Sequence, residues 1–224
     1  LDGLKEAIME MLAGGRCKID TGTFQNDMTS FKSKDDVLTL LVHLGYLAFD
    51  ESTESVFIPN EEVRGEFVRS IKTGGRPELI KMLQMSDQLI QDTLCRNEEK
   101  VAAAIDAVHS ADTVPIHYNN EQALRSVIRR AYISCVEDFV ELQELPAGKG
   151  YADVVYLPKR NSAMPVLLIE LKWDKTAEGA IEQIKHRNYP QALAGYGGDI
   201  LLVGINYDAK MKKHECKIEK IELE

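Results

Sequence analysis

Three charged residues interrupt two of the most apolar segments of the chain, and their types and spacing suit hydrolysis of a phosphodiester. Glu170 and Lys172 lie two residues apart in segment 166–173 (VLLIELKW), so on a β-strand they project from the same face. Asp153 interrupts the apolar segment 151–157 in the same way. Because burial of an unpaired carboxylate is costly, such residues persist where they form an ion pair or hold a cation.

A third carboxylate belongs to the preceding predicted helix, at 120–134. Glu121 lies three residues before Leu124 and seven before Ile128, which places it on the apolar stripe that faces the core. In the helix predicted at 176–189, Gln183 lies beside the apolar stripe.

These positions predict a metal-dependent phosphodiesterase site. Asp153 and Glu170, assisted by Glu121, would supply the hard oxygen ligands that Mg²⁺ or Mn²⁺ prefers. The metal would polarise the phosphate and lower the pKa of an attacking water, and Lys172 would position that water or stabilise the developing charge. The alternative is a structural ion pair of Lys172 with Glu170 or Asp153 at a strand end.

The elements that must position these residues alternate between helix and strand from about residue 109 onward, which is typical of an α/β domain. Segment 166–173 is apolar on both faces and is expected to be a central strand. The other predicted strands cover 136–145, 151–157, 200–206 and 215–221.

The first part of the chain is helical with one hairpin. Ser33 and Asn60 are predicted to cap the helices that flank two short apolar strands. This outline is that of a winged helix; DNA binding and a plain packing or linker role are both compatible with it. Segment 72–77 (KTGGRP) is the predicted linker, so we expect a winged-helix-like domain at 1–75, a helical connector at 76–108 and the α/β domain at 109–224.

Composition limits the remaining function classes. The 224 residues are 44% hydrophobic and 28% charged with a net charge of −9, as in a soluble globular protein that binds nucleic acid, if at all, through a local patch. No apolar run reaches the length of a membrane span, and no signal peptide is expected. The four cysteines are far apart, which favours reduced thiols and a cytoplasmic location. The chain opens at Leu1 rather than Met, so a fragment of a longer protein is expected.

Several stretches resemble the PD-(D/E)XK nuclease superfamily, in the form found C-terminal to an AAA-type ATPase domain in bacterial proteins. The matching stretches are HYNNE (117–121), GKGYADVV (148–155), LLIELKW (167–173), AIEQI (180–184) and LVGINY (202–207). The resemblance implies a restriction-endonuclease-like mixed sheet flanked by helices. It also implies that Asp153, Glu170 and Lys172 form the catalytic core, with Glu121 as the helix carboxylate and Gln183 as the glutamine of the second core helix.

The resemblance also implies a substrate and a partner, and the sequence differs from the family pattern in one motif. The expected substrate is nucleic acid, DNA in preference to RNA, and the expected partner is an N-terminal ATPase domain; the chain has no G-x-x-x-x-G-K-[ST] motif of its own. Relatives often carry G-R-x-D before the first carboxylate, whereas residues 150–153 are GYAD. The alternative function is therefore a catalytically inactive nuclease fold that binds nucleic acid or a protein. Specificity and oligomeric state do not follow from the sequence.

Overall fold

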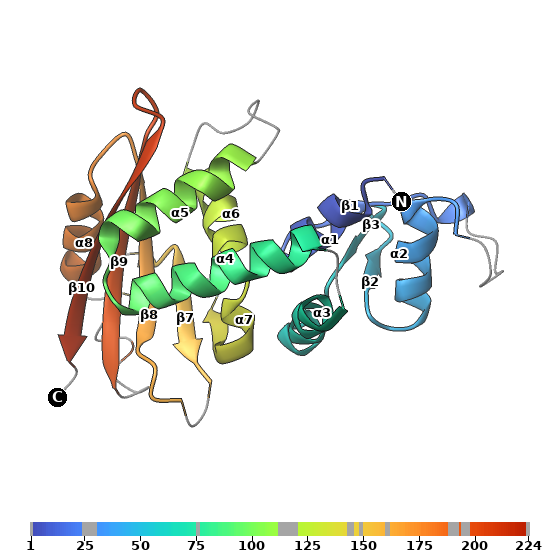
Figure 1. Ribbon diagram of the computed structural model, residues 1–224, viewed down its shortest axis with the longest axis horizontal. Helices are drawn as coiled ribbons and strands as arrows, with labels where there is room; N and C mark the ends of the chain where they lie inside the picture. The colour runs from blue at the N-terminus through green and yellow to red at the C-terminus, as the bar shows by residue number, and fades with distance from the viewer. Residues whose placement is uncertain are drawn as a thin grey trace. The chain divides into compact units, whose positions relative to one another are not determined.

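The computed structural model describes residues 2–23, 31–74, 77–111, 121–142, 146–147, 150–159, 162–187, 193 and 198–222. The chain divides into two compact units, Leu1–Met82 and Leu83–Glu224. Each unit has its own secondary structure and is described separately (Figure 1). The finer division at residues 75 and 108 stays a prediction.

The first unit is a helical region with a small antiparallel sheet. Its strands pair in the order β1-β3-β2, and its interior holds apolar side chains such as Met11, Leu38 and Val56. The elements are α1 (Leu4–Leu12), β1 (Cys17–Lys18), the 3-10 turn η1 (Thr21–Thr23), α2 (Lys34–His43), β2 (Ala48–Asp50), β3 (Ser55–Phe57) and α3 (Glu61–Gly74).

Both predicted helix caps of this unit are confirmed. The Ser33 side chain accepts a hydrogen bond from the Asp36 amide, and the Asp36 carboxylate accepts one from the Ser33 amide, which is a capping box. Asn60 Oδ1 accepts a hydrogen bond from the Val63 amide at the start of α3. Strand β1 was not predicted from the sequence, because two residues are too few to show a period.

The predicted helical connector contains two helices. α4 (Pro77–Leu94) ends in a turn at Arg96, whose φ is 58°, and α5 (Glu98–Ala111) follows. The Asn97 amide donates to the carbonyl of Asp92 across this turn, as in a Schellman motif. The predicted linker is also shorter than expected, since α3 continues to Gly74.

The second unit contains the predicted mixed sheet, with strands in the order β10-β9-β8-β7-β4. The central pair, β8 and β9, is parallel, and the other neighbours are antiparallel. The strands are β4 (Phe139–Leu142), β7 (Val154–Pro158), β8 (Val166–Trp173), β9 (Asp199–Asp208) and β10 (Lys213–Glu222).

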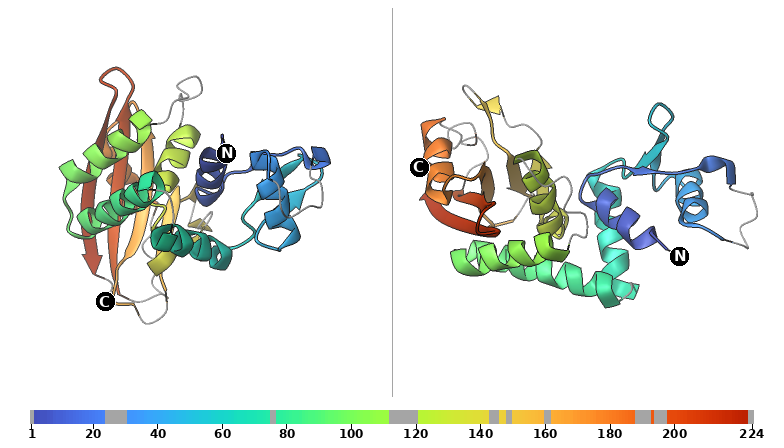
Figure 2. Two further views of the ribbon diagram at one scale, coloured as in Figure 1. Left: turned by 45° about the vertical axis from the view of Figure 1, so that its right-hand side comes forward. Right: turned by 90° about the horizontal axis from the view of Figure 1, so that it is seen from above.

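Helices cover both faces of this sheet (Figures 1 and 2). α5 and α6 (Glu121–Ala131) pack on one face, where Leu167, Ile169 and Leu171 of β8 join the larger apolar core. α8 (Ala177–His186) packs on the other face, against Val166 and Leu168. The alternation of β8 side chains between the two cores puts Glu170 and Lys172 on the α8 face. The predicted fold class, a mixed sheet between helices as in restriction-endonuclease-like domains, is confirmed.

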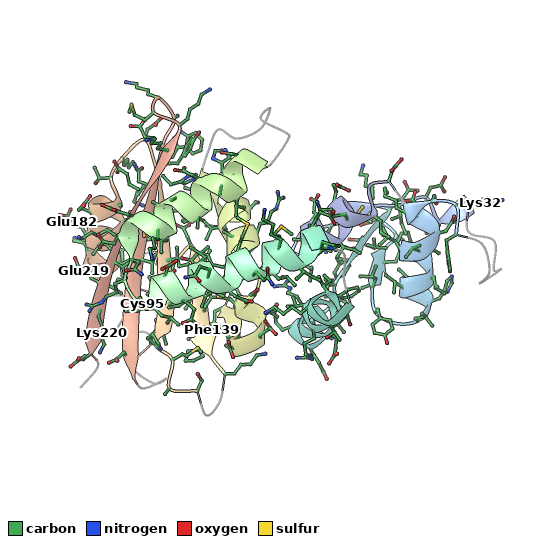
Figure 3. The ribbon with its side chains drawn as sticks, viewed as in Figure 1. Lys32, Cys95, Phe139, Glu182, Glu219 and Lys220 are labelled. Atoms are coloured by element: carbon green, nitrogen blue, oxygen red, sulfur yellow. The ribbon has the colours of Figure 1, made fainter. Side chains whose placement is uncertain are left out.

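The edge strand β10 is long and carries several charged side chains. Lys185 of α8 forms an ion pair with Glu219 of β10 at 2.5 Å, and Figure 3 shows Glu219 and Lys220 on this strand with Glu182 on α8 nearby. Charged side chains along an exposed edge disfavour pairing with another chain.

Two strand predictions in this unit are confirmed only in part. Segment 136–145 begins as a short helix, α7 (Cys135–Asp138), before β4. The strand predicted at 151–157 is interrupted, with β6 (Gly150–Tyr151) paired to β5 (Pro146–Ala147) and β7 starting only at Val154. Asp153 therefore lies in the break between β6 and β7, because its carboxylate bonds the backbone of β8 there.

The described helices include none that is long and apolar enough to cross a membrane. All four cysteines are free.

Candidate metal and phosphate site

β8 carries the central residues of the predicted site into the interior of the second unit. Its first seven residues are buried, and Glu170 and Lys172 are only 2% and 6% exposed. Lys172 Nζ lies 3.2 Å from Glu170 Oε1 and donates a second hydrogen bond to the Leu171 carbonyl. The strand thus buries an opposite-charge pair on the face that α8 covers.

α8 adds Gln183 to this pair. Gln183 Nε2 donates a hydrogen bond to Glu170 Oε1, the same oxygen that Lys172 contacts. Both donors thus converge on Oε1, while Oε2 of Glu170 is buried and makes no hydrogen bond to any described residue. A buried carboxylate oxygen without a donor is unfavourable unless another group binds it.

A glycine in β9 permits the close approach of α8. Gly204 is the register partner of Glu170 on the neighbouring strand. A Cβ atom at this position would lie 2.3 Å from the Ala177 carbonyl oxygen and 3.0 Å from the Ala180 Cβ. The absence of a side chain lets the helix pack directly on the sheet and brings Gln183 within reach of Glu170.

Asn206, two residues further along β9, fixes the connection from β8 to α8. Its Oδ1 accepts from the Lys175 amide at 3.0 Å, and its Nδ2 donates to the Lys175 carbonyl at 2.9 Å. Thr176 then caps α8 by accepting a hydrogen bond from the Gly179 amide. Because Asn206 is buried and bonds the backbone twice, it sets where α8 begins.

Asp153 reaches the same region from the break before β7. Its Oδ2 accepts a hydrogen bond from the Leu171 amide at 2.9 Å, and its Oδ1 pairs with Arg125 Nη2 of α6 at 2.5 Å. The arginine missing next to Asp153 in the sequence thus has a counterpart that comes from a helix. The structure brings together four predicted site residues: Asp153, Glu170, Lys172 and Gln183.

The electrostatics of the site centre on Glu170. Burial, with a contribution from the negative charge of Asp153, raises the pKa of Glu170 to about 7, although Lys172 and Arg187 act to lower it. A nearby cation would stabilise the ionised form of Glu170, since its charge offsets both the burial and the repulsion from Asp153.

Glu121 is the first residue of α6, and its side chain lies outside the described residues. His117 and residues 148–149 also lie outside them. Within the described part of the chain no three His, Cys, Asp or Glu side chains form a ready metal cluster. Asp153 and Glu170 nevertheless fit a hard divalent cation in chemistry, since carboxylate oxygens are its preferred ligands. One of these oxygens, Glu170 Oε2, is buried and has no hydrogen-bond partner among the residues described here.

Comparison with known proteins supports the same chemistry. Residues 119–217 match the family model of the PD-(D/E)XK nuclease superfamily. The matched segment contains all the site residues described above. No curated protein matches the chain. The match suggests a nuclease and supports a hydrolytic enzyme; nucleases of this superfamily typically use divalent metal ions.

Sequence reasoning missed three residues that shape the site: Arg125, Gly204 and Asn206. Arg125 had a usable signal, because it follows Glu121 by four residues and so lies one helical turn along the same side. Gly204 and Asn206 belong to the matching stretch LVGINY, but their roles depend on which helix packs on β9 and could not be inferred from it.

Proposed function

We propose that the second unit is a metal-dependent nuclease domain that hydrolyses phosphodiester bonds of DNA. Asp153 and Glu170 would hold Mg²⁺ or Mn²⁺, with Glu121 as an additional ligand. When bound, the cation would polarise the phosphate and favour ionisation of the attacking water. The observation that carries the proposal is the buried Oε2 of Glu170, which receives no hydrogen bond from the residues that the structure describes and lies near a second carboxylate, Asp153.

Lys172 is proposed to act on the reacting groups. An ammonium has three N–H donors, and two of them serve Glu170 and the Leu171 carbonyl. The third is suited to orient the attacking water or to stabilise negative charge on the phosphate. Lys172 therefore combines a fixed position with one donor for the reaction.

Gln183 is proposed as a positioning residue. By donating to Oε1 of Glu170, it fixes the carboxylate plane and leaves Oε2 for the cation. This is the role of an outer group that orients a metal ligand.

The test combines metal binding with cleavage. Mn²⁺ is titrated calorimetrically into the chain and into Asp153→Asn, and plasmid DNA, single-stranded DNA and RNA are offered as substrates. Glu182→Gln, which removes an exposed carboxylate beside Gln183, is the matched control. We expect Asp153→Asn to lose Mn²⁺ binding and cleavage while the control keeps both. Absence of Mn²⁺ binding to the unmodified chain refutes the metal site, and preferential cleavage of RNA refutes the DNA assignment.

A second function, a nuclease fold that binds nucleic acid or protein without cutting it, is favoured by one observation. Both oxygens of Asp153 are already engaged, one by the Leu171 amide and one by Arg125. In the assay above this function predicts DNA binding without Mn²⁺ dependence and without cleavage.

The first unit is proposed as the winged-helix-like tail of a longer, cytoplasmic protein that contains an ATPase domain. In support, the unit combines helices with the three-stranded antiparallel sheet β1-β3-β2, and the sequence resembles ATPase-linked relatives. ATP hydrolysis by the full-length protein, compared with this chain, which has no P-loop motif of its own, would test this link.

A further inference from the structure

Arg125 and Asp153 form an ion pair at the boundary of the site. The apolar stripe of α6, which includes Leu124 and Ile128, is buried in the core. Arg125 lies beside this stripe, with its side chain 39% exposed, whereas that of Asp153 is 14% exposed. The carboxylate is therefore inside and the guanidinium reaches it from the solvent side.

The two hydrogen-bond partners of Asp153 differ in how easily they can move away from its carboxylate. The Leu171 amide belongs to the central strand β8, which is paired on both sides, so it is fixed. Arg125 has a long side chain, and its Nε makes no hydrogen bond to the described residues. Within the described part of the chain, the ion pair with Asp153 is the contact that holds the Arg125 guanidinium in place.

A divalent cation that binds Asp153 and Glu170 competes directly with this arginine. A cation at Asp153 and the guanidinium of Arg125 repel each other, so cation binding favours a conformation in which Arg125 has moved away. A phosphate that binds to the cation offers the guanidinium a new partner with two or more oxygens in a suitable geometry.

We infer that Arg125 neutralises the charge of Asp153 until a cation binds. Arg125 then moves away from the carboxylate and binds the substrate phosphate. The inference deepens the proposed nuclease function and rests on it. It makes the binding of metal and of phosphate cooperative, because each ligand favours the conformation in which Arg125 has left Asp153. Arg125 would thus supply the phosphate contact that the GYAD segment lacks.

Calorimetry with two simple probes tests this role. Mn²⁺ is titrated into the chain alone, and thymidine 5′-monophosphate, which has no diester to cut, is titrated with and without Mn²⁺. The variants are Arg125→Gln, Arg125→Lys and, as a control of equal charge change, Lys185→Gln, which breaks the exposed pair with Glu219. Thermal melting checks that each variant folds.

We expect Arg125→Gln to bind Mn²⁺ alone about fivefold more tightly, the size of a partly exposed ion pair. The same variant should bind the nucleotide in the presence of Mn²⁺ about tenfold more weakly, since a charged hydrogen bond is lost. Lys185→Gln should change both affinities less than about twofold. Arg125→Lys should keep the Mn²⁺ affinity but bind the nucleotide about threefold more weakly, because it loses the planar fork.

Unchanged or weaker Mn²⁺ binding by Arg125→Gln, or unchanged nucleotide binding by it, overturns the role of Arg125. If Arg125→Gln does not fold, nucleotide binding by Arg125→Lys equal to that of the parent chain overturns it instead. These results differ from failure of the proposed function itself, in which the parent chain binds no Mn²⁺ at all.

Discussion

Two buried carboxylates of the second unit, Asp92 and Glu170, have opposite environments. Asp92 lies at the corner between α4 and α5, where Gln88 donates to one oxygen and Asn97 to the other. Lys100 lies 3.8 Å away. These hydrogen bonds, above all that from Asn97, hold the pKa of Asp92 below its usual value despite its burial.

Glu170 shows the reverse arrangement. Its two donors, Lys172 and Gln183, share one oxygen, the second oxygen has no donor among the described residues, and Asp153 adds a like charge. The pKa of Glu170 is accordingly raised to about 7. Asp92 is thus a carboxylate that stabilises a turn, whereas Glu170 is one whose ionised form a bound cation would stabilise. Strongly raised carboxylate pKa values such as that of Glu170 cluster at functional sites.

The largest expected difference concerns cleavage. Glu170→Gln should lower Mn²⁺-supported DNA cleavage on the order of 1,000-fold, because a metal ligand is lost and the metal contributes several kcal/mol to the transition state. Asp92→Asn should stay within about threefold, since its partners serve the fold. Initial rates on plasmid DNA measure both. Equal loss in the two variants would remove the functional distinction between the two carboxylates.

The pH dependence of stability should distinguish the two carboxylates next. Glu170 has a pKa of about 7 when folded and an ordinary value of 4.5, so the folded state holds the proton more tightly. Its contribution to stability is full below about pH 4.5 and falls as the pH rises toward about 7. Relative to Glu170→Gln, the metal-free parent chain should therefore lose about 2–3 kcal/mol of unfolding free energy over this interval.

Urea unfolding in chelator at about pH 5 and about pH 8 measures this difference. The comparison between parent and variant cancels groups that titrate in both, including the buried His214. A difference between the two proteins that does not change with pH would show that Glu170 is not held protonated by its surroundings.

A smaller effect is expected at Gly204, on the strand beside Glu170. In Gly204→Ala the new methyl group meets the Ala177 carbonyl, so α8 must shift, and we expect a loss of about 2 kcal/mol of stability, as for overpacked cores. The shift should also draw Gln183 away from Glu170 and weaken Mn²⁺ binding about tenfold.

Gly65→Ala in α3 provides the control for this substitution, since its Cβ would meet Arg69 Nη1 at an ordinary 3.5 Å. It should be neutral or stabilising by up to about 1 kcal/mol. Unfolding free energies of both variants check the pair, and equal stability of Gly204→Ala and the parent would contradict the close packing of α8.

A structural feature of this chain could be predicted from the sequence where the residues that determine it are close together in the chain. β8 was predicted with its observed bounds, because apolar side chains on both faces and the flanking polar residues are local features. The caps Ser33 and Asn60 were predicted for the same reason. The break at Asp153 was not, because a hydrogen bond from β8 stabilises it and that partner is distant in sequence.

The candidate site follows the same rule. The proximity of Glu170 and Lys172 follows from the strand period, whereas the contacts from Arg125, Gly204 and Asn206 require the tertiary arrangement. The environment of Asp92 was also missed: Asn97 lies only five residues away, but its role depends on a helix end inside the connector, whose position was not predicted.

The smallest expected effect concerns Asp92 itself. Asp92→Asn keeps the shape of the side chain but replaces one acceptor oxygen by an amide that meets the donors of Gln88 or Asn97, so it should cost about 1 kcal/mol of unfolding free energy at neutral pH.

The pH dependence of this difference is the second part of the test. Because the pKa of Asp92 is lowered in the folded state, its stabilising contribution is present above its ordinary value of 3.8 and is lost as the pH falls through the folded pKa. The free energy of unfolding of the parent chain should therefore approach that of Asp92→Asn as the pH falls. Relative to Glu170→Gln, the free energy of unfolding of the parent chain should decrease as the pH rises. Unfolding curves of the three proteins from about pH 3 to about pH 8 test both trends, and an Asp92→Asn difference that grows in acid would show that the carboxylate is not stabilised by its neutral donors.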